Sequence, residues 1–292
     1  MHLYHRSFAL LLLLSNFGAF ERETNAQQPA AAPAASGARI LLLPRRIVSG
    51  ERATLAVLDV NGRLTPGVTV SFSNGDRFTT NATGRALFVA PLNPGVIFGS
   101  IAGRTGKVAT AVLTPSEAAS TAIEISSAPR VASLVDRFEI LGRAFCGDAD
   151  SNQVTIAGQP AIVLASSPTA LVVLPPPDLQ PRSAPVEVSC AKRQAPQFSI
   201  TLVGLELQAD ASPLKPGEHR ALAVRVRGTS TKIELEARNL APEIAELTGG
   251  NPVRASSSGG TENFAKFEVV GRKNGGFLVS IRLVPYLGRP QP

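Results

Sequence analysis

Residues able to do acid–base or nucleophilic chemistry are scarce in this sequence. The 292 residues include three His, and His2 and His5 lie in an N-terminal segment that we expect to be removed. His219 is then the only imidazole, so any Ser–His or Cys–His pair must use it, and a multi-histidine metal site cannot be built. It follows the turn residues Pro216–Glu218, which predicts an exposed or edge side chain. We therefore expect no catalytic residue, no cofactor and no metal.

The two cysteines, Cys146 and Cys190, are the next residues whose spacing could matter chemically. In an oxidising compartment, an even pair within one β domain is most simply a disulfide. On the chain-entropy model, closing this loop stabilises the fold by roughly 4 kcal/mol. Two free thiols or a bridge between chains are the alternatives. Two Cys and one distant His fall short of the four ligands that structural zinc takes.

An acidic cluster, Asp148-x-Asp150-x-Asn152, is similar to the start of a calcium-binding loop. Such a loop also needs Gly at its sixth position and a bidentate Glu at its twelfth. Those positions hold Gln153 and Gln159. The cluster therefore predicts a polar turn beside the first cysteine.

Two further patterns predict structural elements rather than a binding or catalytic site. Segment Gly103–Lys107 has part of a phosphate-binding loop, but Ile101 stands where that loop needs its first Gly, and Val108 where it needs Ser or Thr. A hairpin turn is the better interpretation. Glu234 and Glu236 share one face of an expected strand, beside a lysine, which predicts a solvated face rather than an acid–base couple.

Composition favours an all-β chain with dispersed basic charge. Val, Ile, Thr and Gly are frequent and long helical patterns are lacking, which favours short strands. The formal net charge is +7, but the arginines are spread along the chain, whereas nucleic-acid binding needs clustered Lys and Arg interleaved with aromatics. Trp is absent, and Tyr286 is the only Tyr outside the N-terminal segment, which disfavours stacking on sugars.

The N-terminus has the layout of a secretory signal. A short basic start, Met1–Arg6, precedes the apolar run Ser7–Leu14, and Thr24–Ala26 has small residues at its first and third places. This pattern predicts cleavage after residue 26. The apolar run is shorter than the roughly 20 residues that a membrane span needs, so we expect no transmembrane segment in the mature chain. Residues 27–37 form a Pro/Ala-rich spacer that should be extended.

The first expected domain spans residues 38–116. Strand patterns such as Ala53–Val60 alternate with turns, and Asn61-Gly62 is a strong tight-turn signal. The domain contains the motifs Asp59-x-Asn61-Gly62, Pro66-Gly67-Val68-x-Val70-x-Phe72 and Thr80-Asn-Ala-Thr-Gly84-x-Ala86. In this order they resemble the bacterial immunoglobulin-like repeats of invasin-type surface proteins. The resemblance implies a β-sandwich.

The second expected domain spans residues 120–203. Its strands include Phe138-x-Ile140-x-Gly142-x-x-Phe145, Asn152-x-Val154-x-Ile156-x-Gly158 and Val186-x-Val188. As a set they resemble the IPT/TIG domain, an immunoglobulin-like fold of cell-surface receptors, bacterial exported proteins and some transcription factors. Pro175–Pro177 should be an exposed crossover, because Pro cannot donate to a strand ladder.

The third expected domain spans residues 204–286, and residues 287–292 should be a frayed tail. Alternating strands give this domain a generic immunoglobulin-like character. Pattern breaks at Thr114–Ser120 and Val203–Gly204 predict domains that fold separately, with few contacts across the breaks. The expected fold class is thus all-β, with three tandem immunoglobulin-like β-sandwich domains after a signal peptide.

These features predict a non-catalytic exported protein for interaction, adhesion or scaffolding, in the periplasm, on the cell surface or outside the cell. Its partner would be a protein or an envelope polymer, with no role for nucleic acid. Binding residues are unknown from the sequence, although Leu174–Ala184 and Asn251–Thr261 are the longest loops. The alternative is a carbohydrate- or cell-wall-binding accessory module. A hydrolase with a carboxylate pair assembled across strands is a third hypothesis, and a DNA-binding protein conflicts with export.

Overall fold

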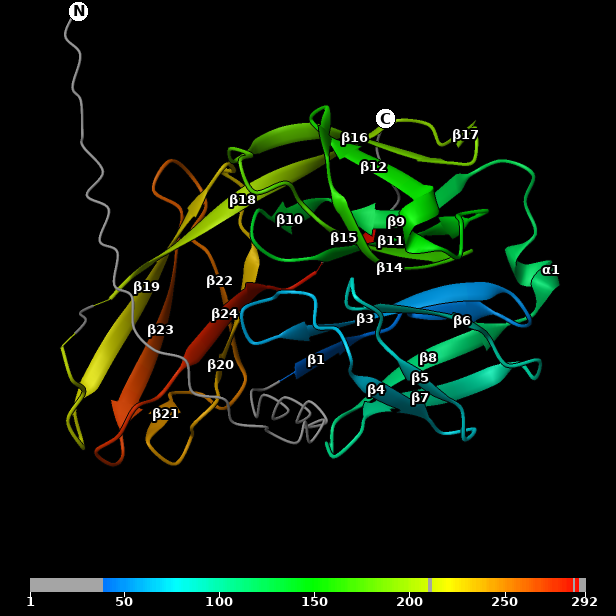
Figure 1. Ribbon diagram of the computed structural model, residues 1–292. Helices are drawn as coiled ribbons and strands as arrows, with labels where there is room; N and C mark the ends of the chain where they lie inside the picture. The colour runs from blue at the N-terminus through cyan, green and yellow to red at the C-terminus, as the bar shows by residue number, and fades with distance from the viewer. Residues whose placement is uncertain (1–38, 210–211, 286, 289–292) are drawn as a thin grey trace, which may run out of the picture. The chain divides into compact units, whose positions relative to one another are not determined.

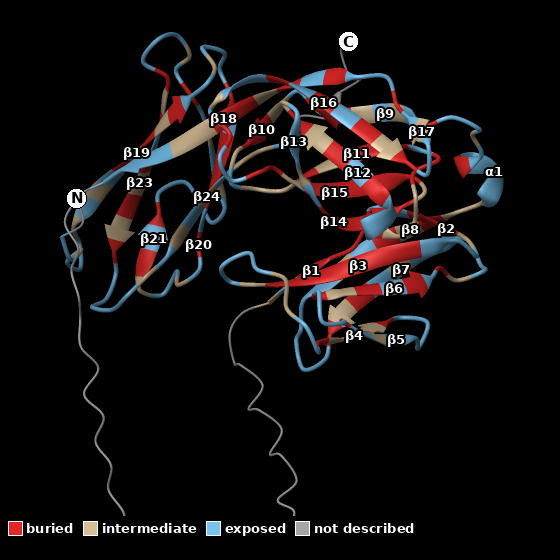
Figure 2. Ribbon diagram, turned by 45° about the horizontal axis from the view of Figure 1, so that its top comes forward, coloured by how far each residue is buried: buried red, intermediate tan, exposed pale blue. Residues whose placement is uncertain are grey.

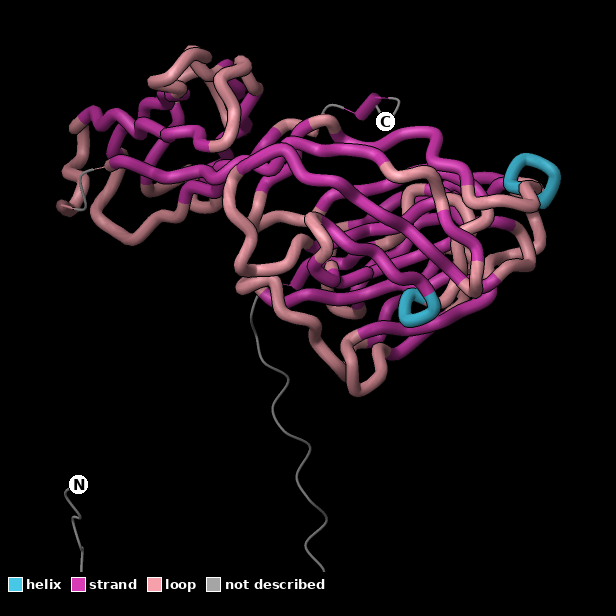
Figure 3. Tube along the Cα trace, turned by 90° about the horizontal axis from the view of Figure 1, so that it is seen from above, coloured by secondary structure: helices cyan, strands magenta, loops and turns pink. Residues whose placement is uncertain are grey.

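The computed structural model describes residues 39–209, 212–285 and 287–288 (Figure 1). The signal peptide at 1–26 and the spacer at 27–37, both predicted above, lie outside these residues. The described chain is all-β, as expected: strands dominate, with one short helix and one 3-10 turn (Figure 3). No helix in the described ranges is long and apolar enough to cross a membrane.

The first eight strands form a two-sheet unit around one hydrophobic core. They are β1 Arg39–Leu42, β2 Arg46–Val48, β3 Arg52–Asp59, β4 Thr69–Phe72, β5 Arg77–Thr79, β6 Arg85–Val89, β7 Gly95–Ile101 and β8 Lys107–Leu113. One sheet has the order β1-β3-β6 and the other β2-β8-β7-β4-β5. The predicted turn at Asn61-Gly62 follows β3, and Gly62 has a φ of 77°, which Gly adopts without strain. Segment Gly103–Lys107 joins β7 to β8 as the predicted hairpin.

The second unit begins after the short helix α1 (Pro115–Ala118) and has two sheets. Its elements are β9 Glu124–Pro129, β10 Val131–Ser133, β11 Phe138–Arg143, η1 Ala149–Ser151, β12 Asn152–Ile156, β13 Gln159–Pro160, β14 Ile162–Ser167, β15 Ala170–Leu174, β16 Arg182–Cys190, β17 Arg193–Gln194 and β18 Phe198–Gln208. The order β9-β11-β15-β14 faces β12-β16-β18, which is the ABED and CFG arrangement of an immunoglobulin fold. Residues of both sheets are buried (red in Figure 2), and they form one hydrophobic cluster.

The third unit starts within β18. Its strands are β19 His219–Arg227, β20 Glu234–Asn239, β21 Ala245–Leu247, β22 Val253–Ser256, β23 Phe264–Gly271 and β24 Val279–Leu283. One sheet has the order β18-β19-β23-β21 and the other β22-β20-β24. A third hydrophobic cluster, from Val203 to Val269, lies between them. The last strand, β25 (Leu287–Gly288), pairs with β9, so the start of the expected frayed tail is a strand.

The break expected at Val203–Gly204 does not exist, because β18 runs straight through it. Residues Arg182–Val186 of β16 pair with the first half of β18, and the second half pairs with β19. The second and third units therefore share one strand. The expectation that few contacts cross this point is wrong.

The first and second units also share contacts that the sequence did not indicate. Ser166 of β14 pairs with Thr54 of β3. Thr54 Oγ1 and Ser166 Oγ both donate to the carbonyl of Gly147, at 2.9 and 2.7 Å, and both side chains are buried. A Cβ at Gly147 would lie 1.9 Å from the Arg52 carbonyl oxygen, so only Gly fits this close approach. The expectation that few contacts cross the break at Thr114–Ser120 is therefore wrong as well.

Candidate functional site

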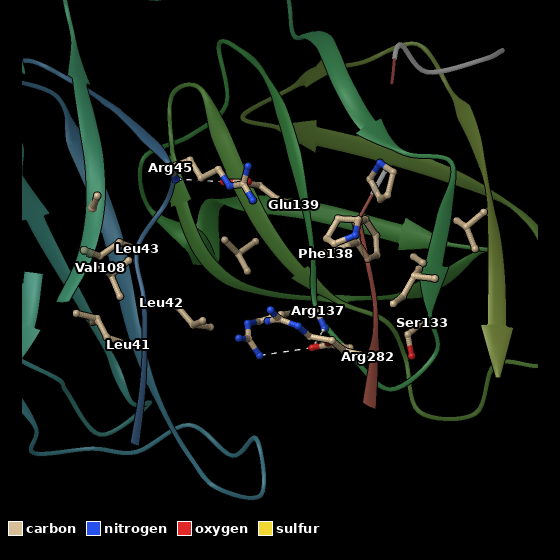
Figure 4. A pocket seen from close by; sticks show the side chains of 18 residues that line it. Leu41, Leu42, Leu43, Arg45, Val108, Ser133, Arg137, Phe138, Glu139 and Arg282 are labelled. Carbon is tan, nitrogen blue, oxygen red and sulfur yellow. Dashed lines mark hydrogen bonds and ion pairs between the residues drawn. The ribbon is translucent and has the colours of Figure 1, made fainter. Parts of the chain in front are cut away.

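A cavity of about 370 Å³ lies where residues of all three units meet (Figure 4). We call it the junction pocket. Its apolar walls include Leu42 of β1, Val131 of β10, Phe138 of β11 and Leu283 of β24. Charged side chains also line it: Arg45, Asp136, Arg137, Glu139 and Arg282. This combination of apolar walls and a few charged groups is typical of a binding site.

A fully apolar run positions the wall formed by β1. Leu41 and Leu43 pack into the core of the first unit, because alternate strand residues point to one face. Leu42 points the other way and packs in a separate buried cluster with Ala165 and Val172 of the second unit. Both faces are therefore covered at the end of β1, which explains why Leu41, Leu42 and Leu43 are apolar without alternation.

Glu139 joins the first two units at the pocket. Its Oε1 accepts a hydrogen bond from the Arg45 backbone N–H at 3.1 Å, and its Oε2 lies 2.9 Å from Arg45 Nε. The Glu139 side chain is only 13% exposed. Burial raises the pKa of Glu139 above its ordinary value, and the hydrogen bond and charge of Arg45 oppose that rise.

Arg282 belongs to a row of charges across the sheet β22-β20-β24. Glu236 of β20 lies directly opposite Arg254 and Arg282. Its Oε1 accepts from Arg282 Nη2 at 2.6 Å, and its Oε2 from Arg254 Nε at 3.2 Å. The hydrogen bond from Arg282, followed by that from Arg254, holds the pKa of Glu236 below its ordinary value against the opposing effect of burial.

This row corrects one sequence interpretation. Glu234 is exposed, as a solvated face requires, but Glu236 is 6% exposed between its two arginines. A buried carboxylate held by two guanidinium groups is a structural ion pair, since both carboxylate oxygens are already hydrogen-bonded.

The accessible charge of the junction pocket is mainly positive. Arg45 and Arg282 are 64% and 58% exposed, whereas the two carboxylates that pair with them, Glu139 and Glu236, are largely covered. Arg137 lies 3.5 Å from Asp136, and Figure 4 shows Arg137 and Arg282 in the space between β1 and β24. An incoming group therefore meets guanidinium groups above apolar walls.

The other chemistry-bearing residues take structural positions. His219 lies on the surface at the start of β19, and its Nδ1 is 3.0 Å from Glu268 Oε1. Asp148 Oδ1 accepts from the N–H of Asp150, and the Asn152 amide donates to the carbonyls of Cys146 and Asp148, so these residues build a turn. Within the described ranges, no three His, Cys, Asp or Glu side chains gather closely enough to hold a metal.

The two cysteines are joined by a disulfide, the pairing favoured by the sequence. Cys146 follows β11 and Cys190 ends β16, with their Cα atoms 5.9 Å apart. The bond thus links the two facing sheets of the second unit.

The two loops singled out in the sequence are neither wholly exposed nor wholly loop. In Leu174–Ala184, Pro175, Pro176 and Leu179 are buried, so the expected exposed Pro crossover is wrong for its first two prolines, and Pro177 is exposed. Part of Asn251–Thr261 is β22. Sequence reasoning missed the junction pocket, and the unbroken apolar run of β1 was the signal that two units meet there.

No family model matches this sequence, and no curated protein matches it. Several solved structures match at low similarity. The mixed-linkage glucan utilization protein SGBP-B of Bacteroides ovatus, in complex with a heptasaccharide, is 14% identical with a TM-score of 0.31, over 87% of this chain and 76% of that one. The I9–I11 tandem of titin is 10% identical with a TM-score of 0.21, over 85% and 98%. The S-layer protein SbsC is 14% identical with a TM-score of 0.20, over 81% of this chain and 36% of that one.

Proposed function

We propose that this chain is a non-catalytic exported interaction protein that holds a protein partner at the junction pocket. The observation that carries the proposal is the pocket itself, where exposed Arg45 and Arg282 and half-buried Arg137 surround apolar walls formed by three β units. Its volume of about 370 Å³ lies in the range of ligand sites. The disulfide and the N-terminal signal pattern support export.

The pocket chemistry favours a protein partner over a carbohydrate. Phe138 is the one aromatic side chain among the lining residues, and it is 9% exposed. A sugar ring therefore finds no open aromatic face to stack on, whereas arginine beside apolar surface is typical of protein interfaces. A periplasmic, cell-surface or extracellular location fits this proposal.

We also propose three domains at 38–116, 120–203 and 204–286, the last two sharing strand β18, with an invasin-type repeat first and an IPT/TIG-like domain second. In each of these two domains the N-terminal strand is split into two parts that pair with different sheets, which supports the family assignments. β1 is antiparallel to β3 and β2 is parallel to β8, and β9 and β10 repeat this pattern with β11 and β18.

Site-specific photocrosslinking tests the interaction in cells that export the protein. A photoreactive amino acid in place of Arg137 should trap a discrete protein partner. The matched control carries it in place of Arg77, an exposed residue of β5 that does not line the pocket, and should trap none. Identical adducts at both positions, or reproducible substrate turnover by the purified chain in a broad hydrolase screen, would contradict the proposal.

A further inference from the structure

The third unit has an open sheet edge at a place where the other two units are closed. In the second unit β18 pairs along the edge of β16, and in the first unit β8 pairs along the edge of β7. The strand in the same topological position of the third unit is β24, next to β20. Within the described residues, β24 has no strand partner on its other side. The immunoglobulin-type sheet C-F-G thus lacks its last strand here.

The open edge leaves core residues incompletely covered. Val279, Ile281 and Leu283 of β24 face the third hydrophobic cluster, yet each is only half-buried. The corresponding residues of β16, Val186 and Val188, are 0% exposed. An extra strand beside β24 would remove this apolar surface from water, which is favourable.

We propose that an extended segment of the partner protein adds to β24 as the missing strand of the third unit. This inference rests on the proposed function and names the chemistry of its partner. Strand addition uses backbone hydrogen bonds for affinity and alternate side chains for specificity. The segment accordingly carries apolar residues opposite Ile281 and Leu283.

The row of charges across this sheet also indicates which type of residue the added strand carries opposite Arg282. Arg254, Glu236 and Arg282 alternate in sign across β22, β20 and β24. The next residue in the row, on the added strand, lies opposite Arg282. Because opposite charges are favourable directly across a ladder and like charges are not, that residue is acidic. The recognised pattern is apolar–acidic–apolar in an extended segment.

Triplets of this pattern in the chain, such as Val186-Glu187-Val188 of β16, lie in strands that are already paired, and the segments on either side of the described strands lack the pattern. Residues 284–292, which follow β24, contain three prolines and no acidic residue, and residues 27–37 contain two prolines and no acidic residue. Proline removes a ladder donor. A second copy of β24 would bring Ser280 and Arg282 rather than a carboxylate. The charge row thus favours a different protein.

The added strand also reaches the site already described. Arg282 and Leu283 lie both on β24 and on the wall of the junction pocket. A partner segment paired along β24 would therefore place its end against the pocket and its arginines.

Disulfide trapping on the mature chain tests this inference, because both native cysteines are already bonded to each other. The variant Ser280→Cys puts a thiol on the outer face of β24. The probe is the synthetic peptide acetyl-Thr-Val-Glu-Val-Cys-Val-Thr-amide, whose Cys lies opposite position 280 and whose Glu lies opposite Arg282 in antiparallel register. The matched control, Ser256→Cys, places a thiol on β22 at the other edge of the same sheet.

We expect the peptide to form a disulfide with Ser280→Cys several times faster than with Ser256→Cys. A peptide with Lys in place of Glu should react about fivefold more slowly, the size that one cross-strand charge pair allows. Adding Arg282→Gln should remove that preference. Equal rates at both edges, or no effect of the Lys peptide, would overturn the inference.

Faster formation of disulfide-linked chain dimers than of peptide adducts would also overturn it, by assigning this edge to a second copy. Failure of peptide trapping while photocrosslinking at Arg137 still captures a partner would reject only the strand addition. Enzymatic turnover would reject the proposed function irrespective of the peptides.

Discussion

The second and third units have the same strand order but differ in how their sheets end. In the second unit β18 closes the sheet, and Ile200 and Leu202 of that strand are at most 1% exposed. In the third unit the chain leaves β24 and pairs with β9 instead. A disulfide also links the sheets of the second unit, whereas the third contains no cysteine. The comparison indicates that one unit is built for stability and the other keeps a strand position open.

The largest expected effect comes from removing the disulfide. The double variant Cys146→Ala/Cys190→Ala should lose roughly 4 kcal/mol of stability on the chain-entropy model, because the unfolded second unit gains the freedom of an open loop. Chemical denaturation followed by circular dichroism would measure it. Quantitative alkylation of both thiols in the unreduced native protein would contradict the bond itself.

A matched pair of core truncations sharpens the comparison. Ile200→Ala should destabilise the protein by about 3 kcal/mol, since it leaves a cavity in a closed core. Ile281→Ala should cost about half as much, because its side chain is already half-exposed. Urea unfolding of both variants measures the difference. Equal losses would mean that β24 is as well covered as β18.

Buried Glu236 and half-buried Glu139 should give opposite pH responses. The pKa of Glu236 is lowered in the folded state, so its contribution to stability is present above about 4.5 and is lost as the pH falls through the folded pKa. The pKa of Glu139 is raised, so its contribution is present below about 4.5 and is lost as the pH rises through the folded pKa. Unfolding free energies of Glu236→Gln and Glu139→Gln across pH 3–7 measure both slopes. Parallel curves would contradict this assignment.

The smallest effect is expected at His219. Its pair with Glu268 is solvent-exposed, and exposed ion pairs contribute about 0–1 kcal/mol. His219→Ala should therefore change the melting temperature little and leave partner capture intact. Loss of capture in that variant would place a binding surface on β19 rather than at the junction pocket.

The sequence was sufficient for the strand character and many turns, because these depend on local residues such as Asn61-Gly62. It failed where a strand changes partner. Nothing in the alternation of β18 shows that its ladder passes from β16 to β19 at Gly204. Thr54 and Ser166 have polar side chains, which are typical of a solvent-exposed strand face. Only the tertiary structure shows that both are buried and donate hydrogen bonds to the Gly147 carbonyl, which joins the first and second units.

The junction pocket was out of reach of the sequence for the same reason. Its walls come from strands far apart in the chain, such as β1 and β24. Glu236 also has the alternation of a solvated residue, and its burial depends on arginines contributed by the two flanking strands.

The continuity of β18 has a mechanical consequence. A pulling force between the second and third units travels along one extended strand, which is held on either side of Gly204 by ladders to β16 and β19. Such a load acts along the strand axis, so the hydrogen bonds of each ladder resist in shear and share the tension. Single-molecule stretching should accordingly show these two units yielding at high force, without the soft extension that a flexible linker gives.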